Sequence, residues 1–296
     1  MIQEHERLGV PASMDESVTA ALSSIRSAGT PDPDLLIFAA TGTAGLLPGL
    51  EGGVRLELKD AEGTPPAFQD LSLHAGTIGA TSVWICEDAP NPAAGGPSWT
   101  RAFPVWLAAA AGAKFLIHTS AGTGLDGEGA AEAPALTPES IVRVTDHINL
   151  SGTTPLLGLG KSRLGPLFPD QTRLHDVALA ALASAVAEAE EITLLSSIAA
   201  CTIGPALSTP AELESYRKAG AGIAVQRLCD PLIAAAHAGL GALALTAITD
   251  LSGEQPSIAD MVLRASRVAP KLDLLVTRIA RDAASLVASR REESPA

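Results

Sequence analysis

The chain has little positive charge for its 296 residues, and this excludes one class of partner. It carries 20 Lys and Arg residues against 33 Asp and Glu residues, so its formal net charge is −13. Proteins that bind nucleic acids need basic surface to neutralise phosphates. We therefore expect no nucleic-acid partner, and the acidic balance is compatible with a cytoplasmic protein.

Cysteine is also scarce, and its spacing excludes a disulfide framework or a cysteine-based metal site. Only Cys86, Cys201 and Cys229 occur, with no Cys-x-x-Cys pair among them. An odd number of widely spaced cysteines in apolar or loop contexts is typical of buried free thiols. The sequence predicts no bound metal.

Long hydrophobic runs are missing as well. The longest, such as Val105 to Gly112, fall well short of the roughly 20 residues that a transmembrane helix needs. The N-terminal segment MIQEHERLGV is charged and lacks the apolar core of a signal peptide. With only three Trp, one Tyr and five Phe, the core is expected to be aliphatic, and no membrane association is expected.

Helix-like and strand-like segments alternate along the chain. Apolar residues at helical spacing predict helices at 15–27, 103–111, 175–189 and, as one or two helices, 257–289. Short apolar or β-branched runs predict strands at 35–40, 54–58, 82–86, 115–119 and 141–145. Repeated strand–turn–helix units predict an α/β fold in a single domain, with a mixed, mostly parallel central sheet flanked by helices.

The segments between these elements predict turns and chain ends. Residues 120–124 are typical of a small-residue turn after a strand, and residues 127–134 of an acidic, mobile loop. No internal repeat or linker divides the chain. The folded domain is expected at residues 15–289, between flexible tails at residues 1–14 and 290–296.

Four motifs follow one another in the chain. They are Thr41-Gly42-Thr43; Phe103-Pro104-Val105 with Thr119-Ser120-Ala121-Gly122-Thr123-Gly124-Leu125; Asp146-His147-Ile148-Asn149-Leu150 with Phe168-Pro169; and the segment from Gly204 to Asp250. In this order they resemble the trimeric purine nucleoside phosphorylase and methylthioadenosine phosphorylase family, as a divergent member, over residues 35–280. The resemblance implies a nucleoside phosphorylase-like fold, a homotrimer and a role in purine salvage. It also implies a purine nucleoside and inorganic phosphate as substrates, with no other cofactor.

The resemblance assigns phosphate binding to Thr43, His74, Ser120 and Arg227. Hydroxyls, backbone N–H groups and cationic side chains are suitable donors to a phosphate dianion. For Thr43 and Ser120, ordinary hydrogen bonding within a turn is an equally good interpretation, and His74 is alternatively an exposed loop histidine. For Arg227 the sequence leaves three orientations open: paired with phosphate, blocking the phosphate pocket, or pointing to solvent.

Two carboxylates mark the largest departure from the family pattern. Glu87 and Asp88 stand where the family usually has an arginine and a histidine that hold phosphate. A carboxylate repels phosphate, so the usual clamp is expected to be absent. Solvated loop charges are the favoured interpretation, and the alternative is a general base that acts on water.

Base recognition is assigned to the segment that ends in Asp250. Members of the family that act on 6-aminopurines have a Ser and an Asp where this chain has Ser208 and Asp250. An Asp donates to purine N7 when protonated and accepts from the 6-amino group. It also stabilises charge on the leaving base, which makes Asp250 the predicted catalytic residue. Ala121, Leu207 and Gln226 complete the predicted base site, although Leu207 and Gln226 replace a Phe and a Met of the family.

Three further positions are expected to act outside the chemistry. Leu164 replaces an aromatic residue that, in the family, reaches the site of a neighbouring subunit. His237 lies on an Ala-rich helix and is expected to be structural, and His147 and Asn149 are expected to fix their loop by hydrogen bonds.

Three functions remain open from the sequence. The favoured one is a phosphorylase that cleaves the N-glycosidic bond of a 6-aminopurine nucleoside such as adenosine or methylthioadenosine. The alternatives are a non-catalytic paralogue with a degraded phosphate site and a phosphate-independent nucleosidase. The losses at Leu207, Gln226, Glu87 and Asp88 favour the non-catalytic alternative, whereas the pair Ser208 and Asp250 favours the enzyme.

Overall fold

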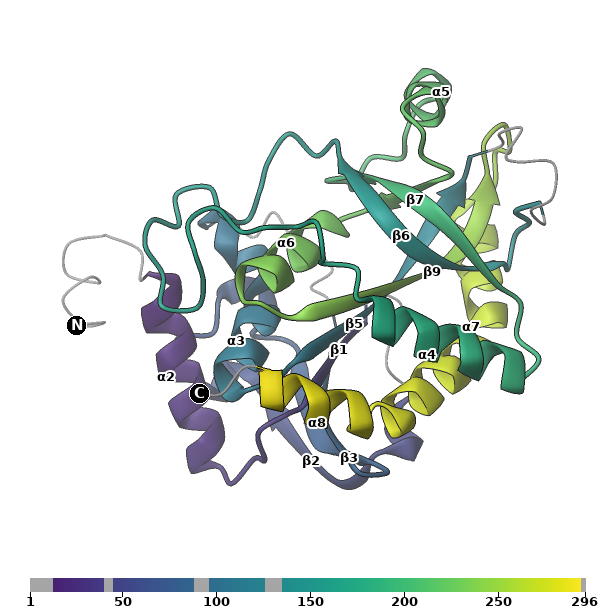
Figure 1. The fold of residues 1–296 in the computed structure, drawn as a ribbon. Coiled ribbons are helices and arrows are strands. Elements are labelled where there is room, and N and C mark those ends of the chain that lie inside the picture. The colour runs from purple at the N-terminus through teal and green to yellow at the C-terminus, as the bar shows by residue number, and fades with distance from the viewer. Residues whose placement is uncertain (1–12, 40–44, 88–95, 126–134, 294–296) are drawn as a thin grey trace.

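A nine-stranded sheet forms the centre of the protein in a computed structural model that describes residues 13–39, 45–87, 96–125 and 135–293 (Figure 1). The strand order is β2-β3-β4-β1-β5-β8-β7-β6-β9, and β5 also pairs with β9. This extra pairing joins the last strand of the sheet back to the middle one. The half of the sheet from β5 to β9 is therefore a closed ring of strand pairs.

The strand bounds are β1 Leu35–Ala39, β2 Glu51–Glu57, β3 Ser72–Ile78, β4 Thr81–Glu87, β5 Phe115–Gly124, β6 Ile141–Asn149, β7 Leu194–Thr202, β8 Ile223–Gln226 and β9 Gly241–Leu251. The parallel pairs are β1–β4, β1–β5, β5–β9, β6–β7 and β7–β8. The antiparallel pairs are β2–β3, β3–β4, β5–β8 and β6–β9. The predicted α/β fold with a mixed sheet is confirmed.

Helices cover both faces of the sheet (Figure 1). Their bounds are α2 Met14–Ser27, α3 Phe103–Ala111, α4 Val177–Ala189, α5 Pro210–Lys218, α6 Cys229–His237, α7 Ile258–Asp282 and α8 Ala284–Glu293, with 3-10 turns at Leu47–Gly49, Leu58–Asp60, Pro66–Phe68 and Ser98–Ala102. Three helices begin with a reciprocal capping box. Its pairs are Ser13 with Glu16, Thr209 with Glu212, and Ser257 with Asp260.

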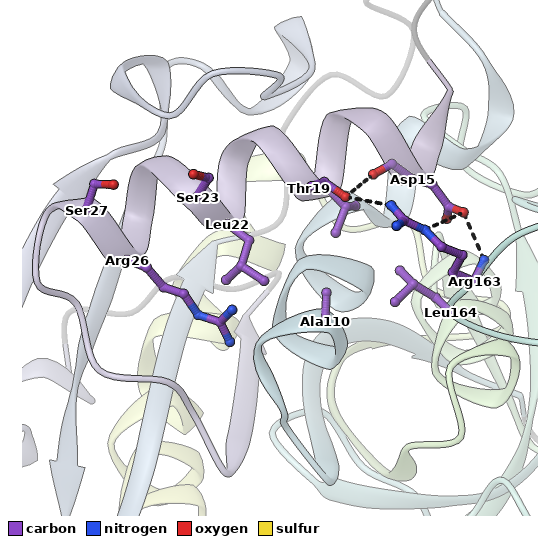
Figure 2. A pocket seen from close by; sticks show the side chains of 10 residues that line it. Asp15, Thr19, Leu22, Ser23, Arg26, Ser27, Ala110, Arg163 and Leu164 are labelled. Carbon is purple, nitrogen blue, oxygen red and sulfur yellow. Dashed lines mark hydrogen bonds and ion pairs between the residues drawn. The ribbon is translucent and has the colours of Figure 1, made fainter. Parts of the chain in front are cut away.

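Helix α2 holds a distant loop against the domain through Asp15. The Asp15 carboxylate accepts hydrogen bonds from the Ser162 hydroxyl and the Arg163 backbone, both at 2.8 Å. The Arg163 guanidinium also donates to the Thr19 hydroxyl at 3.0 Å (Figure 2). A hollow of about 660 Å³ lies along this side of α2, and Leu164 is among its lining residues.

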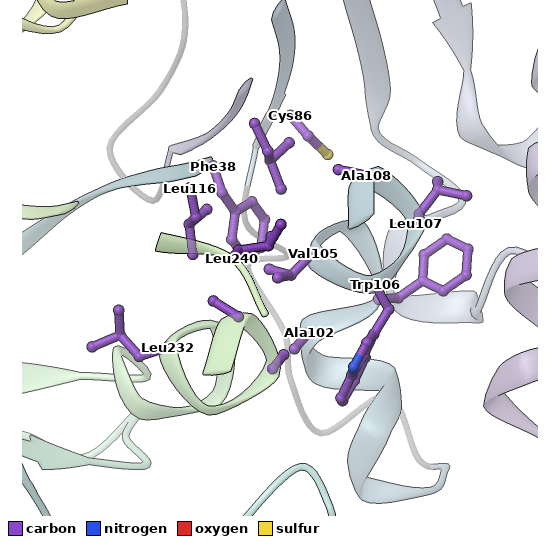
Figure 3. Close-up of a cluster of buried hydrophobic side chains, with 14 of the residues drawn as sticks. Phe38, Cys86, Ala102, Val105, Trp106, Leu107, Ala108, Leu116, Leu232 and Leu240 are labelled. Carbon is purple, nitrogen blue, oxygen red and sulfur yellow. The ribbon is translucent and has the colours of Figure 1, made fainter. Parts of the chain in front are cut away.

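The core has two large parts, one on each face of the sheet. The first packs α2, α3 and α6 against residues such as Phe38 and Leu116 (Figure 3). The second packs α4 and α7 against residues such as Phe115 and Ile117. Because neighbouring side chains of a strand point to opposite faces, Leu116 belongs to one part and its two neighbours to the other.

Several predicted boundaries differ from the structure, and one of them is that residues 146–149, expected to follow a strand, continue β6. Residues 120–124, expected as a turn, continue β5, because all of them pair with β9 and residues 122–124 also pair with β8. Met14, expected in a flexible tail, is buried in the first turn of α2. Helix α8 continues to Glu293, beyond the expected start of the C-terminal tail at residue 290.

Other sequence predictions concern loops and thiols. The predicted acidic loop at 127–134 lies outside the described residues. None of the helices in the described ranges is long and apolar enough to cross a membrane. The three cysteines are all buried and none forms a disulfide, as the sequence predicts.

Candidate functional site

A cavity of about 630 Å³ lies between the carboxyl ends of β5 and β9 and the first half of α7. Its lining residues are Gly45, Ala121, Thr249, Ile258, Met261, Val262, Ala265, Ser266, Ala269, Pro270 and Asp273. Ligands of α/β proteins bind at the carboxyl ends of the strands. A largely apolar lining with a few polar groups, and a volume of several hundred Å³, are typical of sites for small molecules.

Asp250 is not itself among the lining residues, but it follows Thr249, which lines the cavity near the end of β9. The Asp250 side chain is buried, and its Oδ1 accepts a hydrogen bond from the Thr249 hydroxyl at 2.9 Å. From α7, Arg264 donates to the Thr249 carbonyl at 2.9 Å and pairs with Glu254 at 2.7 Å. The hydrogen bond that Arg264 donates to Glu254 is the largest cause that raises the pKa of Arg264, and the charge of Asp250 is a smaller one. The carboxylate is therefore held in an ordered polar network.

The predicted residues Ala121 and Ser120 divide between the two faces of β5. Ala121 lines the cavity. The Ser120 hydroxyl is buried and hydrogen-bonds Thr246 at 2.9 Å, across the β5–β9 pair. The structural interpretation of this hydroxyl therefore agrees with the contact that it makes.

Arg227 lies directly after β8, next to a buried histidine of β5. Its φ is 64°, a left-handed conformation that is rare for a residue other than glycine. His118 is fully buried, and neither ring nitrogen has a hydrogen-bond partner among the described residues. Burial, and then the charge of Arg227, lower the pKa of His118 to about 3. The charge of Arg227 therefore influences a buried side chain, and the Arg227 side chain is itself half-buried.

Gln226 contacts the segment that carries the predicted base residues Leu207 and Ser208, at Ala206 and Gly204. Its side-chain amide donates to the Ala206 carbonyl at 2.9 Å. A Cβ on Gly204, whose φ is 69°, would lie 2.4 Å from Gln226 Oε1, so the turn requires glycine. Leu207 is 55% exposed. Within the described residues, Leu207, Ser208 and Gln226 are not part of the cavity lining, which includes only Ala121 of the predicted base residues.

The phosphate side of the prediction is only partly described. Thr43 and Asp88 lie outside the described residues. His74, for which an exposed loop position was the alternative interpretation, lies in β3 and is half-buried. Burial and the Arg55 charge lower its pKa, whereas the Glu87 charge raises it. Glu87 therefore affects the pKa of the histidine to which the family resemblance assigns phosphate binding.

Asp273 is a site residue that the sequence prediction missed. Its carboxylate lines the cavity against Gly45, where a Cβ would lie 1.8 Å from Oδ2. Burial raises the pKa of Asp273. With Ala265 and Ala269 it forms an i, i+4, i+8 row along α7 that faces the cavity. In the sequence, Asp273 could have been found as a carboxylate that follows Ala265 and Ala269 at helical spacing.

The remaining predicted residues have structural contacts. His237 is buried and accepts a hydrogen bond from Trp106 Nε1 at 3.1 Å, as expected for a structural histidine. Asn149 donates to the Thr153 carbonyl at 2.9 Å, which fixes its loop as predicted. Leu164 packs against the core of its own chain beside α2, and its contact with a neighbouring subunit stays a prediction.

Comparison with known proteins matches the phosphorylase superfamily over residues 36–281. Purine nucleoside phosphorylase 1 of Bacillus subtilis is 27% identical over 256 residues, which cover 84% of this chain and 92% of that protein. Purine nucleoside phosphorylase of Cellulomonas is 33% identical over 181 residues, 60% of this chain and 58% of that protein.

Solved structures show that the chain shares its fold with known proteins. A Schistosoma purine nucleoside phosphorylase in complex with hypoxanthine superimposes with a TM-score of 0.81 at 21% identity, covering 92% of this chain and 99% of that one. The Schistosoma mansoni enzyme in complex with adenosine gives a TM-score of 0.80 at the same identity and coverage. The fold, the cavity at the strand ends and the match over residues 36–281 place this chain in the purine nucleoside phosphorylase family of the phosphorylase superfamily.

Proposed function

We propose that this chain is a phosphorylase that cleaves the N-glycosidic bond of a 6-aminopurine nucleoside with inorganic phosphate. The observation that carries the proposal is the cavity at the carboxyl ends of β5 and β9, where the lining residue Thr249 precedes Asp250. Its volume of about 630 Å³ accommodates a nucleoside and a phosphate ion. The mainly apolar wall from α7 suits the flat faces of a purine.

Asp250 is the proposed catalytic residue. In the reaction a phosphate oxygen bonds to C1′ of the sugar, and the C1′–N9 bond breaks with its electron pair passing to the base. Asp250, through a proton or a bridging group that it shares with N7, stabilises this charge, while its second oxygen accepts from the 6-amino group. Thr249, which hydrogen-bonds Asp250 and lines the cavity, fixes the carboxylate for this task.

Phosphate binding is proposed for the turn containing Thr43, for His74, for the backbone at Ser120 and for Arg227. The half-buried Arg227 supports this, because a guanidinium shielded from water binds a dianion more strongly than an exposed one. We propose that Ala121, Leu207, Ser208 and Gln226 contact the nucleoside base. For residues 204–208 and Gln226 this requires that the segment approach the cavity when the nucleoside is bound.

We further propose that the active form is a homotrimer in which the Leu164 segment contacts a neighbouring subunit. This part of the chain carries exposed apolar side chains, which association would cover. They are Leu150, Leu157, Leu167, Phe168 and Val177. Light scattering of the purified protein measures the assembly, and a monomeric mass would contradict the trimer.

Base release from three nucleosides tests the proposed reaction. Purified protein is incubated with adenosine, methylthioadenosine or inosine, with and without phosphate. The proposal predicts release of adenine that depends on phosphate. Release without phosphate supports the nucleosidase alternative, and no release from any nucleoside, together with no purine binding, supports the non-catalytic one.

The variant Asp250→Asn tests the base preference. Asparagine always offers a donor and an acceptor, and its amide suits the N7 and O6 acceptors of a 6-oxopurine. The ratio of kcat/KM for adenosine to that for inosine should fall. An unchanged ratio removes Asp250 from base recognition, and Asp170→Asn, on an exposed turn, is the matched control.

A further inference from the structure

Two histidines and an aspartate converge at the end of β6, away from the cavity described above. One ligand atom from each of Asp146, His147 and His175 lies within 4.8 Å of the other two. Nδ1 of His147 is 3.2 Å from Nε2 of His175, although the residues are 28 positions apart. Asp146 and His147 belong to one of the motifs that resemble the family, but the proposed reaction gives no task to this cluster.

The fold brings these residues together through an irregularity in the sheet. The β6–β7 register shifts just before Asp146, and the β6–β9 pairing ends at Arg143. His175 then forms a parallel bridge with Ala242 of β9, and the Asp176 N–H donates to the Ala242 carbonyl at 3.0 Å. Beyond Arg143, the segment around His175 therefore pairs with β9 where β6 no longer does. Both histidines are held by sheet contacts on separate segments.

The distance between the two ring nitrogens matches a tetrahedral zinc site. With Zn–N bonds of about 2.0–2.1 Å, two ligands of a tetrahedron are separated by about 3.3–3.4 Å. The observed separation is 3.2 Å. Two imidazoles and one carboxylate form a donor set that binds zinc in preference to calcium or magnesium. We propose that Asp146, His147 and His175 bind one Zn²⁺ ion, with water in the fourth position.

The burial of the three side chains suits this assignment. Both imidazoles are half-buried and Asp146 is exposed, so the open position faces solvent. This leaves a path by which the ion enters. The Gln171 side chain hydrogen-bonds the His147 ring and provides an outer contact of the kind that orients metal ligands.

A zinc ion here would cross-link the base of a long irregular segment. Helix α4 begins at Val177, and β6 ends at Asn149, so the chain between them has no regular helix or strand. This segment includes Leu164 and the residues that Asp15 holds. Closing a loop of this length with a metal stabilises the folded state, because the open chain loses freedom.

A hydrogen bond between two neutral imidazoles is the competing explanation for the 3.2 Å contact. It uses the same two nitrogens and holds the loop without any ion. The two explanations differ in one respect, because only the zinc site gives binding that depends on all three side chains.

Zinc titration of the full-length protein separates them. Protein stripped with chelator is titrated with ZnSO₄ against a chromogenic chelator, and we expect one zinc per chain. His147→Gln and His175→Gln should each weaken binding by more than about 100-fold, a larger loss than outer contacts cause. Asp146→Asn should weaken it by at least about 10-fold. His74→Gln and Asp170→Asn are the matched controls and should bind zinc as the unmodified chain does.

A second measurement on the unmodified protein covers the case in which a variant fails to fold. X-ray absorption at the zinc edge should show two imidazole ligands and no sulfur. No stoichiometric zinc, sulfur ligation, or cluster variants that bind as tightly as the controls would each overturn the proposal.

Discussion

The base side and the phosphate side of the candidate site are built in different ways. At the base side, Asp250 is fixed by Thr249, and Arg264 braces the same strand end from α7. At the phosphate side, Glu87 acts on His74. Ordered hydrogen bonds thus hold the residue proposed for leaving-group stabilisation, whereas His74, one of the residues proposed for phosphate, lies near charges of both signs. The recognition of the base is therefore the more firmly built half of the site.

Removing the carboxylate from the base side should cause the largest loss. For Asp250→Ala we expect kcat/KM for adenosine to fall by about 10²–10³-fold, the cost of one donor to developing charge. Steady-state assays at saturating phosphate measure it. Comparable loss from Asp170→Ala on an exposed turn would show that the effect is not specific to Asp250.

Removing the Arg227 side chain should have a smaller effect, and this effect should be confined to the KM for phosphate. For Arg227→Ala we expect KM for phosphate to rise by about 10–100-fold, in line with about 1.5–3 kcal/mol for a hydrogen bond to a charged group. The ratio of adenosine to inosine activity should not change. Increased activity would instead show that the native guanidinium blocks the phosphate pocket.

The buried His118 behind Arg227 should make stability depend on pH. Burial lowers its folded-state pKa to about 3, below the unfolded value of about 6.5. Its contribution is fully retained above pH 6.5, and is lost as pH falls from 6.5 towards 3, because only the unfolded chain binds the proton. The slope is at most about 1.4 kcal/mol per pH unit.

The variant His118→Leu isolates this slope from that of the carboxylates. Urea unfolding at pH 6 and pH 4 should show a smaller loss of stability for the variant than for the unmodified chain. At pH 7 the variant should unfold at similar or higher urea, because an imidazole without partners is replaced by an apolar group. Equal slopes for both proteins would contradict a neutral buried His118.

Removing a helix cap should have the smallest effect on stability. Two such variants compare α7, which lines the cavity, with α2, which does not. Ser257→Ala, at the start of α7, and Ser13→Ala, at the start of α2, each remove one capping box. Each should cost about 1 kcal/mol of stability. Only Ser257→Ala should also raise KM for the nucleoside, because α7 lines the cavity. Equal KM effects would argue against that role of α7.

Elements with strong periodicity were predictable from the sequence, and the closure of the sheet was not. Helix α3 agrees with the prediction at both ends, because Pro104 and Gly112 mark its limits locally. Residues 120–124 have the composition of a turn but form a strand, because β8 and β9 supply partners on both sides. Such pairings join segments far apart in sequence, and no local pattern records them.

In the candidate site too, residues in local motifs were predictable, whereas those that depend on distant contacts were not. Ala121 was recognised from its motif, and it lines the cavity. Asp273 was missed because it lies on a helix whose inward face is known only once α7 packs on the sheet. The His147–His175 contact was missed because it depends on a bridge between His175 and Ala242. The cysteine spacing, on which the metal prediction relied, carries no information about histidines.

The identity of the sugar product tests the central proposal most directly. Purified protein is incubated with adenosine in phosphate buffer, and the products are separated by mass. We expect adenine and ribose 1-phosphate in equal amounts, because phosphate oxygen bonds to C1′ as the base leaves. Free ribose in place of ribose 1-phosphate, or no adenine at all, would contradict it.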